Sequence, residues 1–476
     1  MKRYEKLAAE IAEAIRSGVL AKGEKLPSVR HTGAARALSA STVFQAYYLL
    51  EAQGLIVARE RSGYYVNAGS SQLQPHGVQE SVRKEASTVD VSELVFEILE
   101  ATRAREGVAL GSAFPSPLLF PLDKLAACMS SSVKAMDPWL TVKDLSPGDL
   151  ELRRQIAQRY LSDGLVVAAE DIVITNGALE ALNLCLSAVT RPGDTVLIEA
   201  PAFYACLQAV EQHGLKAVEI TGHPQQGVDL EAMRQAILQH RPKACWLMTS
   251  FQNPTGSLMP QKHKRALVDL LTEHQIPLIE DDVYGELYFG THKPLPAKAY
   301  DHAGLVMHCS SFSKCLAPGY RVGWVAAGRY ARQVERLKLT SSLATSVPAQ
   351  QALARYLTKG GYDRHLRQLR HQLLLQQIRF MEGIASYFPA ETRISKPDGG
   401  YFLWLKLPGK VDALELYRHA LANQISIAPG PMFSAHHEFR DYIRLNYGHG
   451  WNAETARALQ WLGAFVRDAQ KKNSNE

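Results

Sequence analysis

The sequence predicts two domains of different class: a small N-terminal α+β unit and a large α/β domain built on a mostly parallel sheet. Residues 1–66 contain three helical patterns followed by a hairpin pattern, whereas from about residue 89 short apolar strands alternate with amphipathic helices. A polar stretch without a consistent apolar period separates them. At 476 residues the chain is also longer than one typical domain. We therefore expect domains at 1–67 and 89–476, joined by a linker at 68–88.

The elements of the small unit follow a recognisable order. Apolar residues recur at helical spacing from Tyr4 to Ile15, and Gly18 ends that helix. Pro27 in GEKLPSVR can begin a second helix, and SASTVFQAYYLLEAQG predicts a third. The segment LIVARERSGYYVN alternates, turns at Ser-Gly and alternates again, which predicts a hairpin. Three helices and a hairpin in this order are typical of a winged helix-turn-helix.

The positive charge of the chain, a net +6, is concentrated in this unit. Residues 1–67 hold ten Lys or Arg against six Glu, an excess that favours an anion such as DNA, although solvated helical faces can carry the same excess. A second basic segment, RHLRQLRHQ at 364–372, is interpreted as a solvated helical face, with a DNA-binding stripe as the alternative.

Polar residues follow the predicted strands of the large domain, where ligands of open α/β sheets bind. The strand of DIVITNG is followed by a turn and a helix whose backbone N–H groups can hold a phosphate. The strand of IPLIEDD ends in acids, with Tyr284 three residues after Asp281. The turn FQNPTG presents Asn253, which alone could be only a turn-former. GLVMHCSS leads to Lys314, with Arg321 seven positions on.

These parts fit one cofactor, pyridoxal 5'-phosphate. It needs an amine for a Schiff base, a carboxylate for the pyridinium proton, donors to the ring oxygen and a phosphate cup. The residues that match these four needs are Lys314, Asp281, Asn253 with Tyr284, and Ser311 with Arg321 and the turn Asn176, Gly177 and Ala178.

The segments SFSKCLAPGYRVGW and QNPTG are similar to motifs of the aspartate aminotransferase class of fold-type I pyridoxal phosphate enzymes, a resemblance that covers about residues 110 to 465. It implies an internal aldimine on Lys314, with Asp281 on the pyridine nitrogen and Phe203 stacked on the ring. It also implies that Arg444 takes the α-carboxylate of an amino substrate or effector, for which a guanidinium fork is suited.

The segments GEKLPSVR and STVFQAYYLLEAQGLIVARERSGYYV resemble the GntR-type winged helix. A GntR head on an aminotransferase-like body is the arrangement of the MocR subfamily of bacterial regulators, and the detail is most similar to its YdcR-like members. The resemblance implies DNA contacts by Arg30, Ser41, Thr42, Gln45 and Gly63 and phosphate contacts by Arg59 and Arg61. Many GntR heads carry arginine where this chain has Ala40.

The resemblance implies a transcriptional regulator that binds an operator and senses pyridoxal phosphate or an amino compound. An active aminotransferase acting on an amino acid is the main alternative, and a lyase or racemase a weaker one, because the cofactor residues alone do not separate them. Relatives of fold type I form active sites at a dimer interface, so we expect a homodimer with two heads on two half-sites.

Composition sets further expectations. The six cysteines lack CxxC spacing, so neither a metal site nor a disulfide framework is expected. No apolar run is long enough to span a membrane, and the N-terminus has no apolar signal core. We therefore expect a cytoplasmic protein.

Overall fold

The small N-terminal unit is a three-helix winged helix in the computed structural model, which describes residues 3–21, 23–52, 54–59, 62–67, 85–101, 107–143, 145–223, 225–409 and 411–473. Its elements are α1 (Arg3–Arg16), α2 (Val29–Arg36), α3 (Ala40–Ala52), β1 (Ile56–Arg59) and β2 (Gly63–Val66). The two strands pair antiparallel, with Ile56 opposite Val66, and so form the expected hairpin. The prediction of a winged helix-turn-helix is confirmed.

The helix starts differ in detail from the expectation. Pro27 lies outside α2, because Ser28 is the N-cap residue and its side chain accepts from the His31 amide. Ser39 has the same role before α3, since its hydroxyl accepts from the Thr42 amide at 3.2 Å. The core beneath α3 is made by fully buried residues, namely Val43, Ala46, Tyr47 and Leu50, packed with Leu7 and Ile56.

The large domain contains a nine-stranded sheet within the described residues. Its strands are β3 (Ser87–Thr88), β5 (Ile172–Thr175), β6 (Thr195–Ala200), β7 (Lys216–His223), β8 (Gly227–Val228), β9 (Ala244–Leu247), β10 (Leu278–Asp281), β11 (Val306–Ser311) and β12 (Gly323–Ala326). They are ordered β3-β7-β6-β9-β10-β11-β12-β5, with β8 beside β7. The run from β7 to β11 is parallel, which confirms the predicted α/β class.

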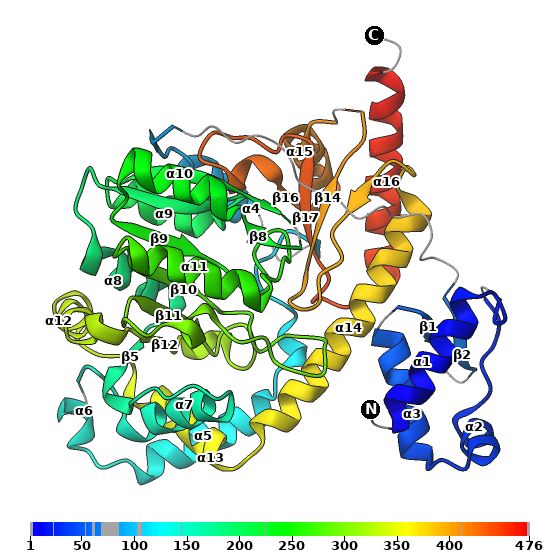
Figure 1. Cartoon of the computed structure of the whole chain (residues 1–476), viewed down its shortest axis with the longest axis horizontal. Coiled ribbons are helices and arrows are strands. Elements are labelled where there is room, and N and C mark those ends of the chain that lie inside the picture. The colour runs from blue at the N-terminus through cyan, green and yellow to red at the C-terminus, as the bar shows by residue number, and fades with distance from the viewer. Residues whose placement is uncertain are drawn as a thin grey trace.

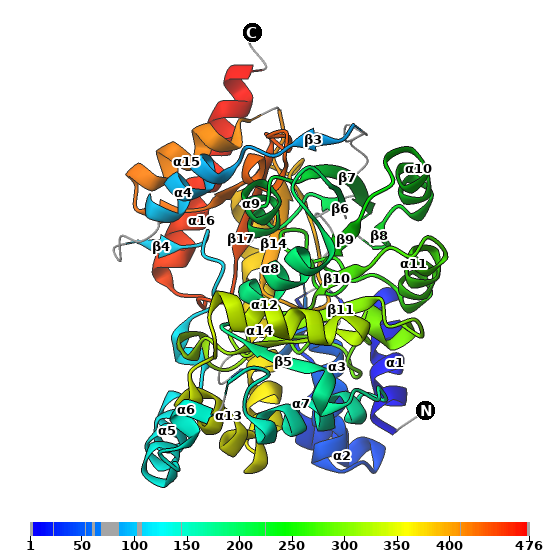
Figure 2. The same cartoon turned by 90° about the vertical axis from the view of Figure 1, so that its left-hand side faces the viewer.

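Helices cover both faces of this sheet, and further helices of the domain pack beyond it (Figure 2). They are α4 (Ser92–Ala101), α5 (Leu122–Ala135), α6 (Leu140–Lys143), α7 (Leu150–Ser162), α8 (Ala178–Val189), α9 (Tyr204–Gln212), α10 (Leu230–His240), α11 (Gln261–Glu273), α12 (Ala331–Ser341) and α13 (Val347–Thr358). Figure 2 shows α10 and α11 on one side of the central strands and α8 on the other.

Consecutive residues of the central strands enter two different apolar cores, because successive side chains of a strand point to opposite faces. One core contains Leu197, Cys245, Leu278 and Val306. The other contains their successors, Ile198, Trp246, Ile279 and Met307. Burial on both faces leaves the strand ends as the place where polar side chains of the sheet gather.

A smaller C-terminal sheet completes the body. Its order is β13 (Arg393–Ile394), β14 (Phe402–Lys406), β17 (Tyr442–Asn446) and β16 (Ala428–Pro429), and a separate pair joins β4 (Val108–Ala109) to β15 (Ile425–Ser426). The remaining helices are α14 (Tyr362–Tyr387), α15 (Ala413–Ala422) and α16 (Ala453–Asn473). Trp404 lies opposite Arg444 in the β14–β17 pair, and the Arg444 guanidinium bonds to Asn253, which follows β9 of the nine-stranded sheet.

The small unit contacts the long helix α14 of the body, beside which it lies in Figure 1. The ring centroids of Tyr48 on α3 and His371 on α14 are 5.3 Å apart. Buried Glu51 of α3 is attracted electrostatically by Arg379 of α14. The basic 364–372 segment is therefore partly a contact surface for the head, and its Arg364 and Arg367 side chains are exposed.

Two sequence expectations fall at the junction of the domains. Ser87–Thr88, expected at the end of the linker, instead pair antiparallel with β7 and extend the large sheet. Residues 68–84 of the expected linker lie outside the described residues.

Candidate functional site

The carboxyl ends of β10 and β11 carry the charged centre of the site. Asp281 is the last residue of β10 and pairs in register with Cys309, two residues before the end of β11 at Ser311. Lys314 lies in the turn after β11 and interacts electrostatically with Asp281. The Lys314 amine donates to the Ala113 carbonyl at 3.0 Å and lies 3.6 Å from the centroid of the Phe114 ring.

The pKa values of this acid and this base are brought together. Burial lowers the pKa of the Lys314 amine to about 7, although the Asp281 charge opposes the change. Burial raises the pKa of Asp281 to about 7, and the neighbouring Asp282 charge adds to the rise. An amine that loses its proton near neutral pH is a nucleophile for a carbonyl carbon, which is the property that a Schiff-base lysine needs.

Asp281 and Asn253 also present unused hydrogen-bonding atoms. Asp281 Oδ1 and Asn253 Nδ2 are both buried and have no hydrogen-bond partner among the described residues. Buried polar atoms without partners are costly in a folded chain, so a group that supplies their partners is expected. A pyridinium N–H suits the first and a phenolic oxygen suits the second.

A cradle lies where the sequence predicts the phosphate cup. Arg321 donates to Ser313 Oγ at 3.2 Å and to the Asn176 carbonyl at 3.3 Å. Gly177 has a φ of +87°, and a Cβ there would lie 2.3 Å from Arg321 Nη2, so only glycine leaves room for the guanidinium. Ser311 Oγ accepts from the Ser313 amide at 3.3 Å. The predicted serine, arginine and glycine turn are therefore adjacent, at the start of α8.

Asn176 uses its donors within the protein. Its amide donates to Glu180 Oε2 at 2.5 Å, and its side-chain amide donates to Glu180 Oε1 at 3.2 Å. Glu180 in turn accepts from Lys338 at 2.7 Å. Ala178, the first residue of α8, is nearly buried and follows directly after Gly177.

Arg444 is buried next to Asn253. Its Nη1 donates to Asn253 Oδ1 at 2.8 Å and its Nη2 to the Gly111 carbonyl at 2.6 Å, while Nε is buried and has no partner among the residues that the structure describes. The rings of Phe402 and Phe433 lie 4.3 Å and 5.3 Å from its guanidinium carbon. Within the described part of the chain no acidic side chain pairs with it. A buried, uncompensated guanidinium suits a carboxylate ligand.

Residues 111–114 take part in the site although the sequence gives no sign of it. Their carbonyls accept from Arg444 and Lys314, and the Ala113 carbonyl also accepts from Tyr401 at 3.1 Å. The Tyr401 ring packs edge-on against that of Tyr284, with centroids 5.4 Å apart. Every residue type has a backbone carbonyl, so these contacts cannot be predicted from the sequence.

The remaining predicted cofactor residues are at strand and helix ends. Tyr284 follows β10 and is almost fully buried, and burial raises its hydroxyl pKa well above the ordinary value. Phe203 is the residue before α9 and packs on Tyr204, with ring centroids 4.6 Å apart.

The predicted DNA contacts belong to the helices and the wing of the head. The side chains of Ser41 and Gln45 are exposed, as are Gly63 and Arg30. Thr42 is half-buried. The hydroxyl of Ser39 bonds to those of Ser41 and Thr42, at 2.9 Å and 2.8 Å. Of the phosphate contacts expected on the wing, Arg59 belongs to β1 and Arg61 lies outside the described residues.

Metal ligands and membrane spans are both absent from the part of the chain that the structure describes. It contains no group of three or more His, Cys, Asp or Glu that could hold a metal ion. None of its helices has both the length and the apolarity needed to cross a membrane.

The comparisons with known proteins match both domains. Residues 3–66 match the model for bacterial regulatory proteins of the gntR family, and residues 142–462 match that for aminotransferase class I and II. The α-aminoadipate aminotransferase LysN of Thermus thermophilus, solved with N-(5'-phosphopyridoxyl)-L-leucine, superposes with a TM-score of 0.73 at 27% identity, over 79% of this chain and 95% of LysN.

Two curated relatives align with this chain over their whole length. The uncharacterized HTH-type transcriptional regulator YdcR of Escherichia coli K12 is 47% identical over 98% of this chain and 100% of its own length. YjiR of the same strain, also an uncharacterized HTH-type transcriptional regulator, is 36% identical over 99% of this chain and 100% of its own length. The chain therefore belongs to the HTH-type transcriptional regulators that join a GntR winged helix to an aminotransferase class I and II domain, the MocR arrangement.

Proposed function

We propose that this regulator binds pyridoxal 5'-phosphate covalently at Lys314, binds an amino compound at the same site, and changes its DNA binding in response. The observation that carries the proposal is that Lys314, whose pKa burial lowers to about 7, interacts electrostatically with Asp281, whose buried Oδ1 has no partner among the described residues. A cluster that served only stability would leave neither a buried Asp oxygen nor a buried Asn amide unbonded.

Each residue of the site has a proposed contact with the cofactor. Asp281 accepts a hydrogen bond from the pyridinium nitrogen, and Asn253 Nδ2 and the Tyr284 hydroxyl donate to the phenolic oxygen. Ser311, Arg321 and the backbone amide of Ala178 would bind the phosphate at the start of α8, where the helix dipole favours an anion, while the Gly177 amide donates to the Thr175 carbonyl at 2.8 Å. When bound, the cofactor supplies an aldehyde that reacts with amines and a ring that withdraws electrons.

The amino compound is expected to carry a carboxylate. Arg444 binds it, exchanging the Gly111 carbonyl for an ionised acceptor. With the ligand's amine bound to the cofactor in place of Lys314, the Lys314 side chain would be free to hold or move a proton beside the site. The segment at 111–114 bonds to both Lys314 and Arg444, so ligand binding at either residue changes its contacts.

A homodimer is part of the proposal. Leu118, Trp139 and Val142, before and after α5, expose apolar side chains, with 90%, 65% and 62% of their area accessible. A second copy of the chain would cover such a surface and place two heads on two half-sites. All six cysteines are free and buried, in keeping with a reduced cytoplasm.

An active aminotransferase is the second candidate function. The match to LysN and the complete set of cofactor residues favour it. The head argues for regulation, because an enzyme acting only on amino acids has no use for an exposed recognition helix. Steady turnover of an amino acid and an oxo acid, without any effect on DNA binding, would support the enzyme.

Borohydride trapping tests the cofactor part of the proposal. The purified protein is incubated with pyridoxal phosphate, reduced, digested and mapped by mass spectrometry. We expect the phosphopyridoxyl mass on Lys314, and none on the Lys314→Ala variant. A label on Lys293 or Lys338, or no label at all, would contradict it.

A further inference from the structure

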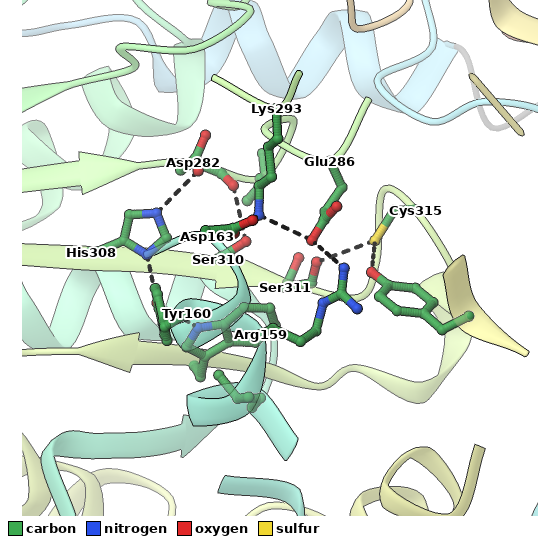
Figure 3. Close-up of a pocket in the computed structure, with 14 residues that line it drawn as sticks. Arg159, Tyr160, Asp163, Asp282, Glu286, Lys293, His308, Ser310, Ser311 and Cys315 are labelled. Carbon is green, nitrogen blue, oxygen red and sulfur yellow. Dashed lines mark hydrogen bonds and ion pairs between the residues drawn. The ribbon is translucent and has the colours of Figure 1, made fainter. Parts of the chain in front are cut away.

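A cavity of about 40 Å³ lies next to Asp281, the carboxylate proposed to bind the cofactor, between the strand ends and α7. Figure 3 shows its labelled lining, which includes Asp282, His308 and Tyr160. None of these three residues has a role in the site described above. Asp282 directly follows Asp281, so the cavity and the cofactor site are separated by a single residue step.

A chain of hydrogen bonds ends on Asp282. The Trp324 indole nitrogen donates to the Tyr160 hydroxyl at 3.0 Å, and the same hydroxyl bonds to His308 Nδ1 at 2.7 Å. His308 Nε2 bonds to Asp282 Oδ2 at 3.0 Å (Figure 3). Each partner comes from a different element: β12, α7, β11 and the end of β10.

The donors in this chain follow from its two ends. An indole N–H only donates, so the Tyr160 oxygen accepts from Trp324. A carboxylate only accepts, so His308 Nε2 donates to Asp282, and Nδ1 of the neutral imidazole then accepts the Tyr160 hydroxyl hydrogen. The chain therefore aims an N–H at the Asp282 carboxylate.

The fold also reserves space for this carboxylate. A Cβ at Gly285 would lie 2.5 Å from Asp282 Oδ2 and 2.6 Å from Oδ1, so no larger residue fits there without a shift. Asp282 is 6% exposed, and its Oδ1 is buried without a partner among the described residues. A group needed only for packing could be replaced by an apolar side chain at little cost in stability.

The other charges of the cavity largely balance one another. Lys293 pairs with Asp163 at 2.7 Å and with Glu286 at 3.1 Å. Arg159 pairs with the same Glu286 at 2.9 Å and with Asp363 at 3.0 Å. Two cations thus face three carboxylates before Asp282 is added.

We propose that Asp282 and His308 are positioning residues that hold a fixed negative charge directly behind Asp281 and so favour the protonated form of the cofactor's pyridine nitrogen. The inference rests on the proposed function, since the pyridine nitrogen belongs to the cofactor. A carboxylate one residue away, screened by little water, attracts a pyridinium proton more strongly than a distant charge does.

The charges that face these two carboxylates are consistent with this role. Glu280 and Asp282 both raise the pKa of Asp281, while Lys314 opposes them. Asp281 itself acts on buried Glu199, whose pKa burial raises to about 8. Asp282 interacts electrostatically with Lys293 and Lys264. The Lys264 amine donates its hydrogen bonds to Ser250 and to the Leu295 carbonyl.

A cofactor analogue separates a charge effect from structural damage. The analogue has C–H in place of the pyridine nitrogen and keeps the aldehyde and phosphate. Both compounds are titrated into the full-length protein and into Asp282→Asn, which keeps an oxygen that accepts from His308. We expect the variant to lose about tenfold in affinity for pyridoxal phosphate and less than about twofold for the analogue.

Asp163→Asn is the matched control, because it makes the same substitution on the same cavity but at the Lys293 pair. We expect it to change the ratio of the two affinities by less than about twofold. Equal losses for both compounds in Asp282→Asn, or no loss for either, would overturn the proposal. If that variant fails to fold, Tyr160→Phe decides, with an expected fall of about threefold in the same ratio.

The outcome is distinct from a failure of the proposed function. If the unaltered protein forms no borohydride-stable product at Lys314, cofactor binding itself is refuted. The other case is that the product forms in the unaltered protein and in Asp282→Asn. If the ratio of the two affinities is then the same in these two proteins, only the role of Asp282 and His308 is refuted.

Discussion

Arg444 Nη1 donates to Asn253 Oδ1 across 2.8 Å, so the arginine of β17 that we propose binds a carboxylate is bonded to the turn that follows β9. The residue that would recognise the ligand and the residue that would recognise the cofactor are therefore in direct contact. A ligand that took Arg444 Nη1 as its donor would leave Asn253 Oδ1 without this bond. This contact offers a route from effector binding to the cofactor, and it crosses from the small sheet to the large one.

Replacing Arg444 with lysine tests its selectivity. Lysine keeps the charge but loses the fork that binds both oxygens of a carboxylate. We expect Arg444→Lys to weaken the spectral response to α-amino acids by about ten- to a hundredfold, as is typical of a lost charge-assisted bond. The response to an amine that has no carboxylate should be unchanged, and an equal loss for both ligands would contradict the assignment.

Replacing Arg321 with alanine tests the phosphate cradle. We expect Arg321→Ala to weaken pyridoxal phosphate by about tenfold or more, because it removes two donors of a charge-assisted contact. Pyridoxal, which has no phosphate, should bind the variant and the unaltered protein equally. Arg329, which bonds to Gln275 on the surface, is the matched control. A loss for pyridoxal as large as that for the phosphate would show that Arg321 acts elsewhere.

The rate of cofactor attachment should depend on pH in a defined direction. The neutral amine is the nucleophile, and burial lowers the pKa of Lys314 to about 7. The fraction of neutral amine therefore increases as the pH passes upward through about 7, and the rate should rise with it. Stopped-flow absorbance at a series of pH values measures this rate. A midpoint near about 10, the ordinary value for lysine, would contradict the assignment.

The salt dependence of DNA binding should report how many basic residues of the head contact phosphates. Arg30 forms no ion pair within the described residues, whereas Arg36 pairs with Glu10 at 2.7 Å. We expect Arg30→Ala to weaken binding to all sequences and to reduce the slope of log affinity against log salt by about one. Arg36→Ala should change the slope less, and equal slopes for the Arg30 variant and the unaltered protein would place Arg30 off the DNA.

The sequence predicted the parts of the fold that local pattern controls. The strands predicted in DIVITNG, IPLIEDD and GLVMHCSS are β5, β10 and β11, because a doubly covered sheet needs apolar residues on both faces. The winged helix was predicted from helix spacing and the Ser-Gly turn. The pairing of Ser87–Thr88 with β7 was missed, since two residues at a sheet edge carry no period.

The candidate site was predictable where its residues lie in short motifs. Lys314, Asp281 and Arg321 are close to one another, as strand ends that meet at one edge must be. The chain from Trp324 through Tyr160 to His308 was not predictable, because it joins elements distant in sequence and depends on side-chain direction. The pattern around His308 indicates only a strand residue, and its bond to Asp282 is visible in the structure alone.

The most direct test of the account is a DNA titration of the full-length protein by fluorescence anisotropy. The labelled DNA is the intergenic segment upstream of the protein's own gene, at one stated salt concentration, with and without pyridoxal phosphate. The account predicts tight binding that resists competitor DNA and changes when the cofactor is added. Weak binding, equal on random DNA and unaltered by the cofactor, would contradict it and favour an aminotransferase.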